Sequence, residues 1–186
     1  MLEDSDKIEL LKLARKTLEA HLNKQATPDS HIFQNNLLEQ KGAFVSLHRN
    51  EELRGCIGLL SPDQALYKIV QHCVLSAALK DTRFTPVTQE ELKDLDIEIS
   101  VLTPFRRIQN IEEIEVGKHG LYIVQGPFRG LLLPQVATQY RWDRTTFLEQ
   151  TCRKSGLSAS AWKDSHTAIH IFEAEVFSES DFPVER

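Results

Sequence analysis

The sequence predicts an α+β fold, with a mainly antiparallel sheet and flanking helices, and three observations lead to this class. Two pairs of strand-like segments are each joined by a tight turn, as in β-hairpins. Helical segments lie among the strands without the regular alternation of a βαβ protein, and no internal repeat is present. With 41% hydrophobic and 26% charged residues in 186, the chain has the size and balance of one globular domain. We therefore expect residues 1–186 to form a single domain.

The first part of the chain is expected to contain a helix, a hairpin and a second helix. Apolar residues recur at spacings of three and four over residues 5–23, so they share one stripe of a packing helix. Residues 43–48 and 53–57 are typical of two strands joined by a polar turn. Ser61-Pro62-Asp63-Gln64 has the composition of a capping box, which predicts that the second helix starts there and ends near Lys80.

The middle of the chain is expected to add a short helix and a strand. A second capping box at residues 88–91 predicts the helix. Residues 97–102 alternate apolar side chains with Glu98 and Ser100. This alternation indicates a strand with one solvated or site-facing side.

The last part is expected to contain a second hairpin, two helical segments and a long strand. Residues 121–125 and 129–133 flank a Gly-Pro-Phe turn and predict the hairpin. Residues 134–140 begin with proline and form a helical turn, and residues 143–155 form a helix with aspartate as its cap and glycine directly after its end. Residues 167–177 are predicted to form one long strand.

Charge and hydropathy exclude several classes of protein. The formal net charge of -5 argues against general nucleic-acid binding, which needs a basic surface. The first residues are acidic where a signal peptide would be basic, and no apolar run approaches the roughly 18 residues that span a bilayer. We therefore expect a cytoplasmic protein with no membrane contact.

The three cysteines indicate neither a disulfide framework nor a zinc site, because their number is odd and none forms a CxxC pair. The helical spacing around Cys73 and Cys152 predicts that both are packed in a core. His166 and His170 would lie about 13 Å apart along a strand, too far to share one ion. We expect no metal site.

The stretch LRGCIG, residues 53–58, holds the first candidate site. Strict strand alternation puts Arg54 and Cys56 on one face, about 6.6 Å apart, where the guanidinium could fold back and lower the pKa of the thiol. Gly55 and Gly58 would let a ligand or another backbone approach closely. The alternative is that the glycines mark a bulge or strand end and Cys56 fills a small buried gap.

Other candidates are open to two interpretations each. His119, in a polar turn, could serve as the base that a nucleophilic cysteine needs, or it could simply be solvated. Arg83, two residues after Asp81, could bind an anion or form a surface ion pair of little energetic value. Trp142 could line a pocket or pack in the core.

With these residues identified, the chain resembles the AMMECR domain family, whose bacterial and archaeal members are called protein A of the AmmeMemoRadiSam system. LRGCIG is the hallmark of that family. Glu51 departs from it, because a glycine is frequent in the turn before the hallmark. The further matching blocks, in order, are residues 42–45, 81–87, 97–103, 117–121, 130–137, Phe147-Leu148 and Trp162.

The resemblance implies an α+β fold in two lobes, a larger sheet with helices and a smaller sheet part, with the hallmark near the cleft between them. Residues 1–39 would then be an N-terminal helix and loop, 40–177 the hallmark-bearing region and 178–186 a tail. The family has no agreed activity. It implies a pathway shared with a Memo-type protein and a radical SAM enzyme as partners.

Two functions follow as hypotheses, neither with a cofactor. In the first, Cys56 is the nucleophile and His119 the base of an acyl or amide transferase or hydrolase acting on a small molecule or modified side chain. In the second, a non-catalytic module binds a ligand or partner in the same cleft. The residues expected to bind substrate are Arg54, Gly55, Gly58, Arg83, Gln135 and Trp142, with backbone N–H groups near the two glycines stabilising an oxyanion. A regulatory role with nucleic acid is a third hypothesis, which the acidic balance weakens.

Overall fold

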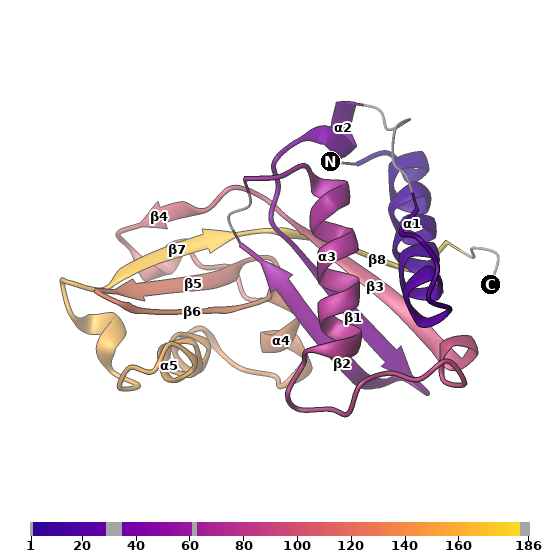
Figure 1. Cartoon of the computed structure of the whole chain (residues 1–186). Coiled ribbons are helices and arrows are strands. Elements are labelled where there is room, and N and C mark those ends of the chain that lie inside the picture. Colours follow the sequence, from indigo (N-terminus) through magenta and orange to yellow (C-terminus); the bar gives the residue numbers. More distant parts are fainter. Residues whose placement is uncertain (1, 29–34, 61–62, 183–186) are drawn as a thin grey trace. The chain divides into compact units, whose positions relative to one another are not determined.

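The computed structural model describes residues 2–28, 35–60 and 63–182, and divides the chain into two compact units (Figure 1). Unit 1 spans Met1–Val101 and Glu175–Arg186, and unit 2 is the intervening segment Leu102–Ala174. The chain forms two four-stranded sheets, one in each unit apart from the boundary residues Leu102 and Ala174, together with helices. The predicted α+β class is therefore confirmed.

The sheet of unit 1 has the strand order β2-β1-β3-β8. Its strands are β1 (Ala43–Arg49), β2 (Glu52–Leu59), β3 (Leu95–Leu102) and β8 (Ala174–Ser178). The central strand β1 pairs antiparallel with both β2 and β3. The predicted first hairpin and the strand at residues 97–102 are therefore present, and β2 is an edge strand.

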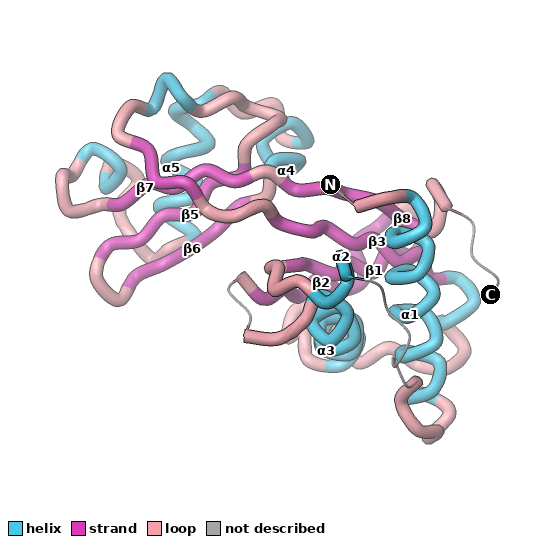
Figure 2. The backbone as a smooth tube through the Cα atoms, turned by 90° about the horizontal axis from the view of Figure 1, so that it is seen from above, coloured by secondary structure: helices cyan, strands magenta, loops and turns pink. Residues whose placement is uncertain are grey.

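Helices α1 (Asp4–Leu22) and α3 (Leu66–Leu79) lie on the same side of this sheet (Figure 2). Alternate side chains of β1 and β3, among them Val45 and Ile97, form one buried cluster with Leu11, Leu18 and other apolar residues of the helices. The apolar stripe predicted for residues 5–23 is thus the buried side of α1. The sheet's other face carries the polar residues between these positions.

The helix predicted to follow the first hairpin begins later than the sequence indicated. Helix α3 starts at Leu66, with Ala65 in the N-cap position. Ser61 and Pro62, on which the predicted capping box depended, lie outside the described residues. The short helix predicted from residue 88 is a single 3₁₀ turn, Leu92–Asp94.

The β1–β2 hairpin contains a tight turn and an irregularity. Asn50 and Glu51 both have positive φ, 52° and 67°, as the central residues of a type I′ turn require, so the turn forms without the glycine frequent in the family. Leu47 pairs with Gly55 but His48 pairs with Leu53, which makes Arg54 the extra residue of a β-bulge. Strict alternation therefore fails at Arg54.

The sheet of unit 2 has the order β4-β7-β5-β6, and all of its pairs are antiparallel. Its strands are β4 (Arg106–Ile108), β5 (Gly120–Gln125), β6 (Phe128–Leu132) and β7 (Ala168–Phe172). The predicted second hairpin is confirmed as β5–β6.

Helices α4 (Pro134–Gln139) and α5 (Arg144–Lys154) also follow the sequence prediction. The side chain of Asp143 accepts a hydrogen bond of 2.7 Å from the Thr146 N–H at the start of α5, and Gly156 has φ 79° just beyond its end. Helix α5 packs on one face of the sheet, with Phe147, Leu148 and Cys152 in the core of unit 2. The remaining helical segments are α2 (Asn35–Leu38) and the 3₁₀ turns Ile111–Glu113 and Ala161–Lys163. None of the helices in the described ranges is long and apolar enough to cross a membrane.

The single strand predicted for residues 167–177 is wrong. The chain breaks at Glu173 into β7 and β8, which belong to different sheets. Glu173 is tied to Thr103: the Thr103 N–H donates to the Glu173 carbonyl at 2.9 Å, and the Glu173 N–H donates to the Thr103 hydroxyl at 2.8 Å. The two ends of unit 2 are thereby hydrogen-bonded to each other.

Candidate functional site

Three side chains form a row across the polar face of the unit 1 sheet: Cys56 on β2, Ser46 on β1 and Glu98 on β3. Ser46 pairs directly with Cys56 on one side and with Glu98 on the other. The row spans about 10 Å, two strand spacings. The Ser46 hydroxyl donates a hydrogen bond of 3.3 Å to the Cys56 sulfur. A thiol, a hydroxyl and a carboxyl group thus lie side by side, and we call them the Cys56–Ser46–Glu98 row.

The backbone of Cys56 is bound by a carboxylate. Its N–H donates to Asp81 Oδ2 at 2.9 Å, and Arg83 donates to Asp81 through Nε at 2.9 Å and Nη2 at 2.6 Å. The Arg83 guanidinium and two backbone N–H groups hold the pKa of the buried Asp81 carboxyl well below its usual range, although burial opposes them. Of the backbone N–H groups near Gly55 and Gly58 that we expected to stabilise an oxyanion, the one at Cys56 is therefore already occupied.

The Cys56 thiol is half-buried, and burial raises its pKa above the ordinary value. The hydrogen bond from Ser46 and the positive charge of Arg83 oppose this shift without reversing it. Burial likewise raises the pKa of Glu98. The thiol is therefore protonated at neutral pH, contrary to the effect expected from a nearby arginine.

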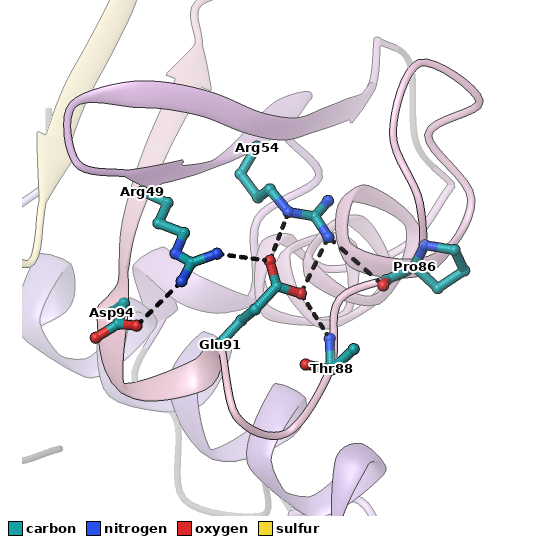
Figure 3. Close-up of polar contacts among 6 residues, drawn as sticks. All are labelled: Arg49, Arg54, Pro86, Thr88, Glu91 and Asp94. Atoms are coloured by element: carbon teal, nitrogen blue, oxygen red, sulfur yellow. Dashed lines mark hydrogen bonds and ion pairs between the residues drawn. The ribbon is translucent and has the colours of Figure 1, made fainter.

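Arg54 is held by Glu91, not by Cys56 (Figure 3). Its Nε and Nη2 donate to the two Glu91 carboxylate oxygens at 2.9 and 3.1 Å. Arg49 and the Thr88 N–H bind the same carboxylate, at 3.4 and 2.9 Å. Arg54 also keeps the pKa of Glu91 low. Because the bulge places Arg54 out of register, its guanidinium joins β2 to the segment before β3.

The two glycines of LRGCIG are explained by close packing. A β-carbon at Gly55 would lie 2.2 Å from the carbonyl oxygen of Ala77 in α3. A β-carbon at Gly58 would lie 2.4 Å from the ring of Phe44, its partner across the hairpin. We expected a ligand or another backbone to come close to these glycines. The protein itself occupies the space at both of them, with the Ala77 carbonyl at Gly55 and the Phe44 ring at Gly58.

His119 is buried, with 7% of its surface exposed, which excludes the solvated alternative. Its Nδ1 accepts a hydrogen bond of 3.1 Å from the Glu115 N–H, and its Nε2 lies 3.9 Å from a carboxylate oxygen of Glu173. His119 belongs to unit 2 and Cys56 to unit 1. Its role as base for Cys56 stays a prediction.

Gln135 and Trp142 also belong to unit 2. Gln135 lies in the first turn of α4, and its buried Oε1 has no hydrogen-bond partner among the described residues. Trp142 packs partly on the core of the unit and stacks on Tyr140, with the ring centroids 5.0 Å apart. Their role in binding substrate is untested by these contacts.

Sequence reasoning missed Ser46, Asp81 as a ligand of the Cys56 backbone, and Glu91. The alternation around Glu98 did indicate a site-facing side, but its partners depend on the strand order. Cys73 and Cys152 are buried in the two cores, as predicted. Within residues 2–28, 35–60 and 63–182, no three His, Cys, Asp or Glu side chains are grouped so that they could hold a metal ion.

Comparison with known proteins places the chain in a family. The AMMECR1 family model matches residues 11–177. Protein Mbar_A1807 of Methanosarcina barkeri is 40% identical over 97% of this chain and 94% of its own length, and protein NEQ441 of Nanoarchaeum equitans is 37% identical over 91% and 98%. The crystal structure of uncharacterized protein PH0010 from Pyrococcus horikoshii is similar with a TM-score of 0.92, at 36% identity, over 97% of this chain and 94% of that one. The chain therefore belongs to the AMMECR1 family.

Proposed function

We propose that this AMMECR1 family member is a binding module that holds a small molecule or a segment of a partner protein on the Cys56–Ser46–Glu98 row, without covalent chemistry at Cys56. The observation that carries the proposal is the Asp81 carboxylate on the Cys56 N–H. A cysteine nucleophile needs a low thiol pKa and donors left for the developing oxyanion. Here burial raises the thiol pKa, and the nearest backbone donor is bound.

A half-buried row of three hydrogen-bonding groups is suited to recognition. The Cys56 sulfur and the Glu98 carboxyl lie on either side of the Ser46 hydroxyl, so one ligand about 10 Å long could contact all three. Because Glu98 makes no ion pair among the described residues, its carboxyl is available for a donor on the ligand. Polar groups of this kind fix orientation and specificity in binding sites.

A cysteine-dependent enzyme is the second candidate, and Glu98 is the observation that favours it. Glu98 lies about two strand spacings from Cys56, beyond direct reach of the thiol, so its half-buried carboxyl, with a raised pKa, is a candidate general base for a substrate or water lying along the row. In that reaction Cys56 would lose its proton to a base and attack the acyl or amide carbon to form a thioester, the substrate's amine or alcohol would leave with that proton, and water or an acceptor would then take the acyl group. His119 is the other candidate base.

The pH dependence of Cys56 alkylation separates the two functions. Rates of iodoacetamide labelling between pH 6 and 10 would be followed at each cysteine by peptide mass spectrometry. The binding module predicts a half-maximal rate above the pKa of about 8.5 of a free cysteine. Ser46→Ala should move it further up, because the Ser46 hydrogen bond lowers the pKa. A midpoint below about pH 7 would instead assign Cys56 as a nucleophile.

The Memo-type and radical SAM proteins remain the proposed partners, and the support is the family membership alone. The purified chain and the Memo-type protein of the same genome would be mixed and examined by native mass spectrometry. Binding that survives Cys56→Ser but weakens with Glu98→Gln is the expected result. Failure of the unmodified chain to bind the Memo-type protein at micromolar concentration contradicts a direct contact with it.

A further inference from the structure

The negative charge of the chain belongs to one unit. Unit 2 contains nine Lys and Arg against seven Asp and Glu, a formal charge of +2, whereas the rest of the chain contains thirteen against twenty, or -7. The net charge of -5, which argued against nucleic-acid binding, is therefore the sum of two units of opposite charge. The charge of unit 2 by itself does not argue against nucleic-acid binding.

Most acidic side chains of unit 2 are already paired. Four glutamates form ion pairs with cations of the same unit: Glu112 with Arg144, Glu113 with Arg106, Glu115 with Lys118, and Glu173 with Lys118. The strands β4, β5, β6 and β7 contain no acidic residue at all. The sheet surface of unit 2 therefore carries only positive or neutral side chains.

One face of this sheet combines arginines with aromatic rings. Arg107 on β4 pairs with His170 on β7, which pairs with Tyr122 on β5, so the three side chains share a face. Val124, two residues after Tyr122, pairs with Arg129 on β6 and puts that arginine on the same face. We call Arg107, His170, Tyr122 and Arg129 the aromatic–basic face.

On this face the two arginines lie on the edge strands of the sheet, and the rings of His170 and Tyr122 lie on its central strands. Strands β4 and β6 are the edge strands, about 14 Å apart, and β7 and β5 lie between them. Both arginines are exposed and make no ion pair among the described residues, while Tyr122 and His170 are half-buried. Phe105 stacks on Tyr122, with centroids 4.9 Å apart and planes at 28°.

Helix α5 covers the other side of the sheet. A β-carbon at Gly130 would lie 2.5 Å from the Ser155 hydroxyl at the end of α5, and Gly130 pairs with the buried Ile123, which alternates with Tyr122 and Val124. The helix that fills the core of unit 2 therefore does not lie on the aromatic–basic face.

We infer that the aromatic–basic face of unit 2 binds single-stranded nucleic acid. Bases of a single strand stack on aromatic rings, and arginines contact its phosphates. Four-stranded sheets with aromatic side chains on central strands stack bases in this way in RNA-binding domains. Two arginines on opposite edges, about 14 Å apart, suit two non-adjacent phosphates of one strand better than the single phosphate of a nucleotide. This site is separate from the Cys56–Ser46–Glu98 row of unit 1.

Fluorescence anisotropy with a labelled uridine decamer tests this inference in the full chain, between 50 and 200 mM salt. Arg107→Ala with Arg129→Ala should reduce the slope of log K against log salt by about 1.4, or about 0.7 for each phosphate contact. Tyr122→Leu should weaken binding at least about fivefold, because the stacked Phe105–Tyr122 pair on which a base would lie is lost. Adenosine monophosphate should compete far less well than unlabelled decamer.

Lys12→Ala with Lys16→Ala is the matched control, since it removes two exposed cations from α1 of unit 1. It should leave both the affinity and the salt slope unchanged. The arginine variant alters only exposed side chains, so its far-UV circular dichroism should match that of the parent. Absence of decamer binding at 50 mM salt, equal loss in the lysine control, or equal affinity for adenosine monophosphate would overturn the inference.

Discussion

Gly55 illustrates how much of the LRGCIG stretch is determined by contacts within unit 1. Its missing side chain lets α3 approach β2 until the Ala77 carbonyl fills the space of a β-carbon. Arg54 binds Glu91, and the Cys56 N–H binds Asp81, so the segment after α3 is attached to the edge strand at two points. Covering an edge strand in this way prevents pairing with another chain.

Gly55→Ala should destabilise unit 1. The new methyl group would overlap a backbone oxygen that cannot rotate away, and overpacking of this kind costs about 1–3 kcal/mol. Urea unfolding followed by circular dichroism measures the loss. Gly58→Ala is the comparison: its methyl group meets the Phe44 ring, a side chain that can move, so its cost should be smaller. Equal stability of Gly55→Ala and the parent would contradict the close contact.

Only part of the LRGCIG stretch could be predicted from the sequence alone. The strand, the hairpin and the two interpretations of the glycines follow from local patterns. The position of Arg54 does not follow from them, because the alternation of side chains along a strand does not reveal where one extra residue forms a bulge. Its partner Glu91 is 37 residues away, and the neighbours of Ser46 depend on which strands are adjacent.

Three helices end in the same hydrogen-bonded motif but with different residues. After α5, the Leu157 N–H bonds to Cys152 and the Gly156 N–H to Arg153, the Schellman pattern. The same two bonds close α1 and α4, where Lys24 and Arg141 occupy the left-handed position with φ 57° and 53°. The sequence predicted the end of α5 from its glycine, while the lysine and arginine gave no such signal.

Glycine at the left-handed positions should stabilise the protein. Arg141→Gly and Lys24→Gly each remove a strained side chain, with a gain of up to about 1 kcal/mol in the free energy of unfolding. Gly156→Ala imposes the same strain and should lose a similar amount. Thermal unfolding of the three variants measures these changes. A loss of stability in both glycine variants would show that the side chains contribute more than their strain costs.

The break at Glu173 could not be found from local pattern. Residues 167–177 are rich in apolar and β-branched side chains on both sides of Glu173, so propensity favours one strand. The break arises because β7 pairs with β4 and β5, whereas β8 lies next to β3. Only the pairing of distant segments separates the two strands.

At the scale of the whole molecule, the first helix and the C-terminal segment are joined by a buried ion pair. Arg15 binds both carboxylate oxygens of Glu179 and donates to the carbonyls of Leu92 and Leu95, and the Ile97 N–H donates to Glu179. The side chains of Arg15 and Glu179 are 2% and 1% exposed. Each nitrogen of the Arg15 guanidinium therefore has a hydrogen-bond partner inside unit 1.

Glu179→Gln should be strongly destabilising, because it leaves the Arg15 charge buried without its counter-ion. Removing one partner of such a pair costs about 3–5 kcal/mol. Circular dichroism should show the shift in urea midpoint, while both tryptophans, Trp142 and Trp162, report on unit 2. Glu113→Gln breaks an exposed pair with Arg106 and should barely change the midpoint. A similar midpoint for both variants would contradict the role of the buried pair.

The insertion of unit 2 between β3 and β8 also sets an order of events on the ribosome. Unit 2 is one continuous segment, so all of it emerges before the last strand of unit 1. Arg15 is synthesised early, and its counter-ion follows 164 residues later. Since domains fold as units while the chain is made, unit 2 can fold first and unit 1 only after its last strand, β8, has been synthesised. Unit 1 therefore starts before unit 2 in the chain and is completed after it.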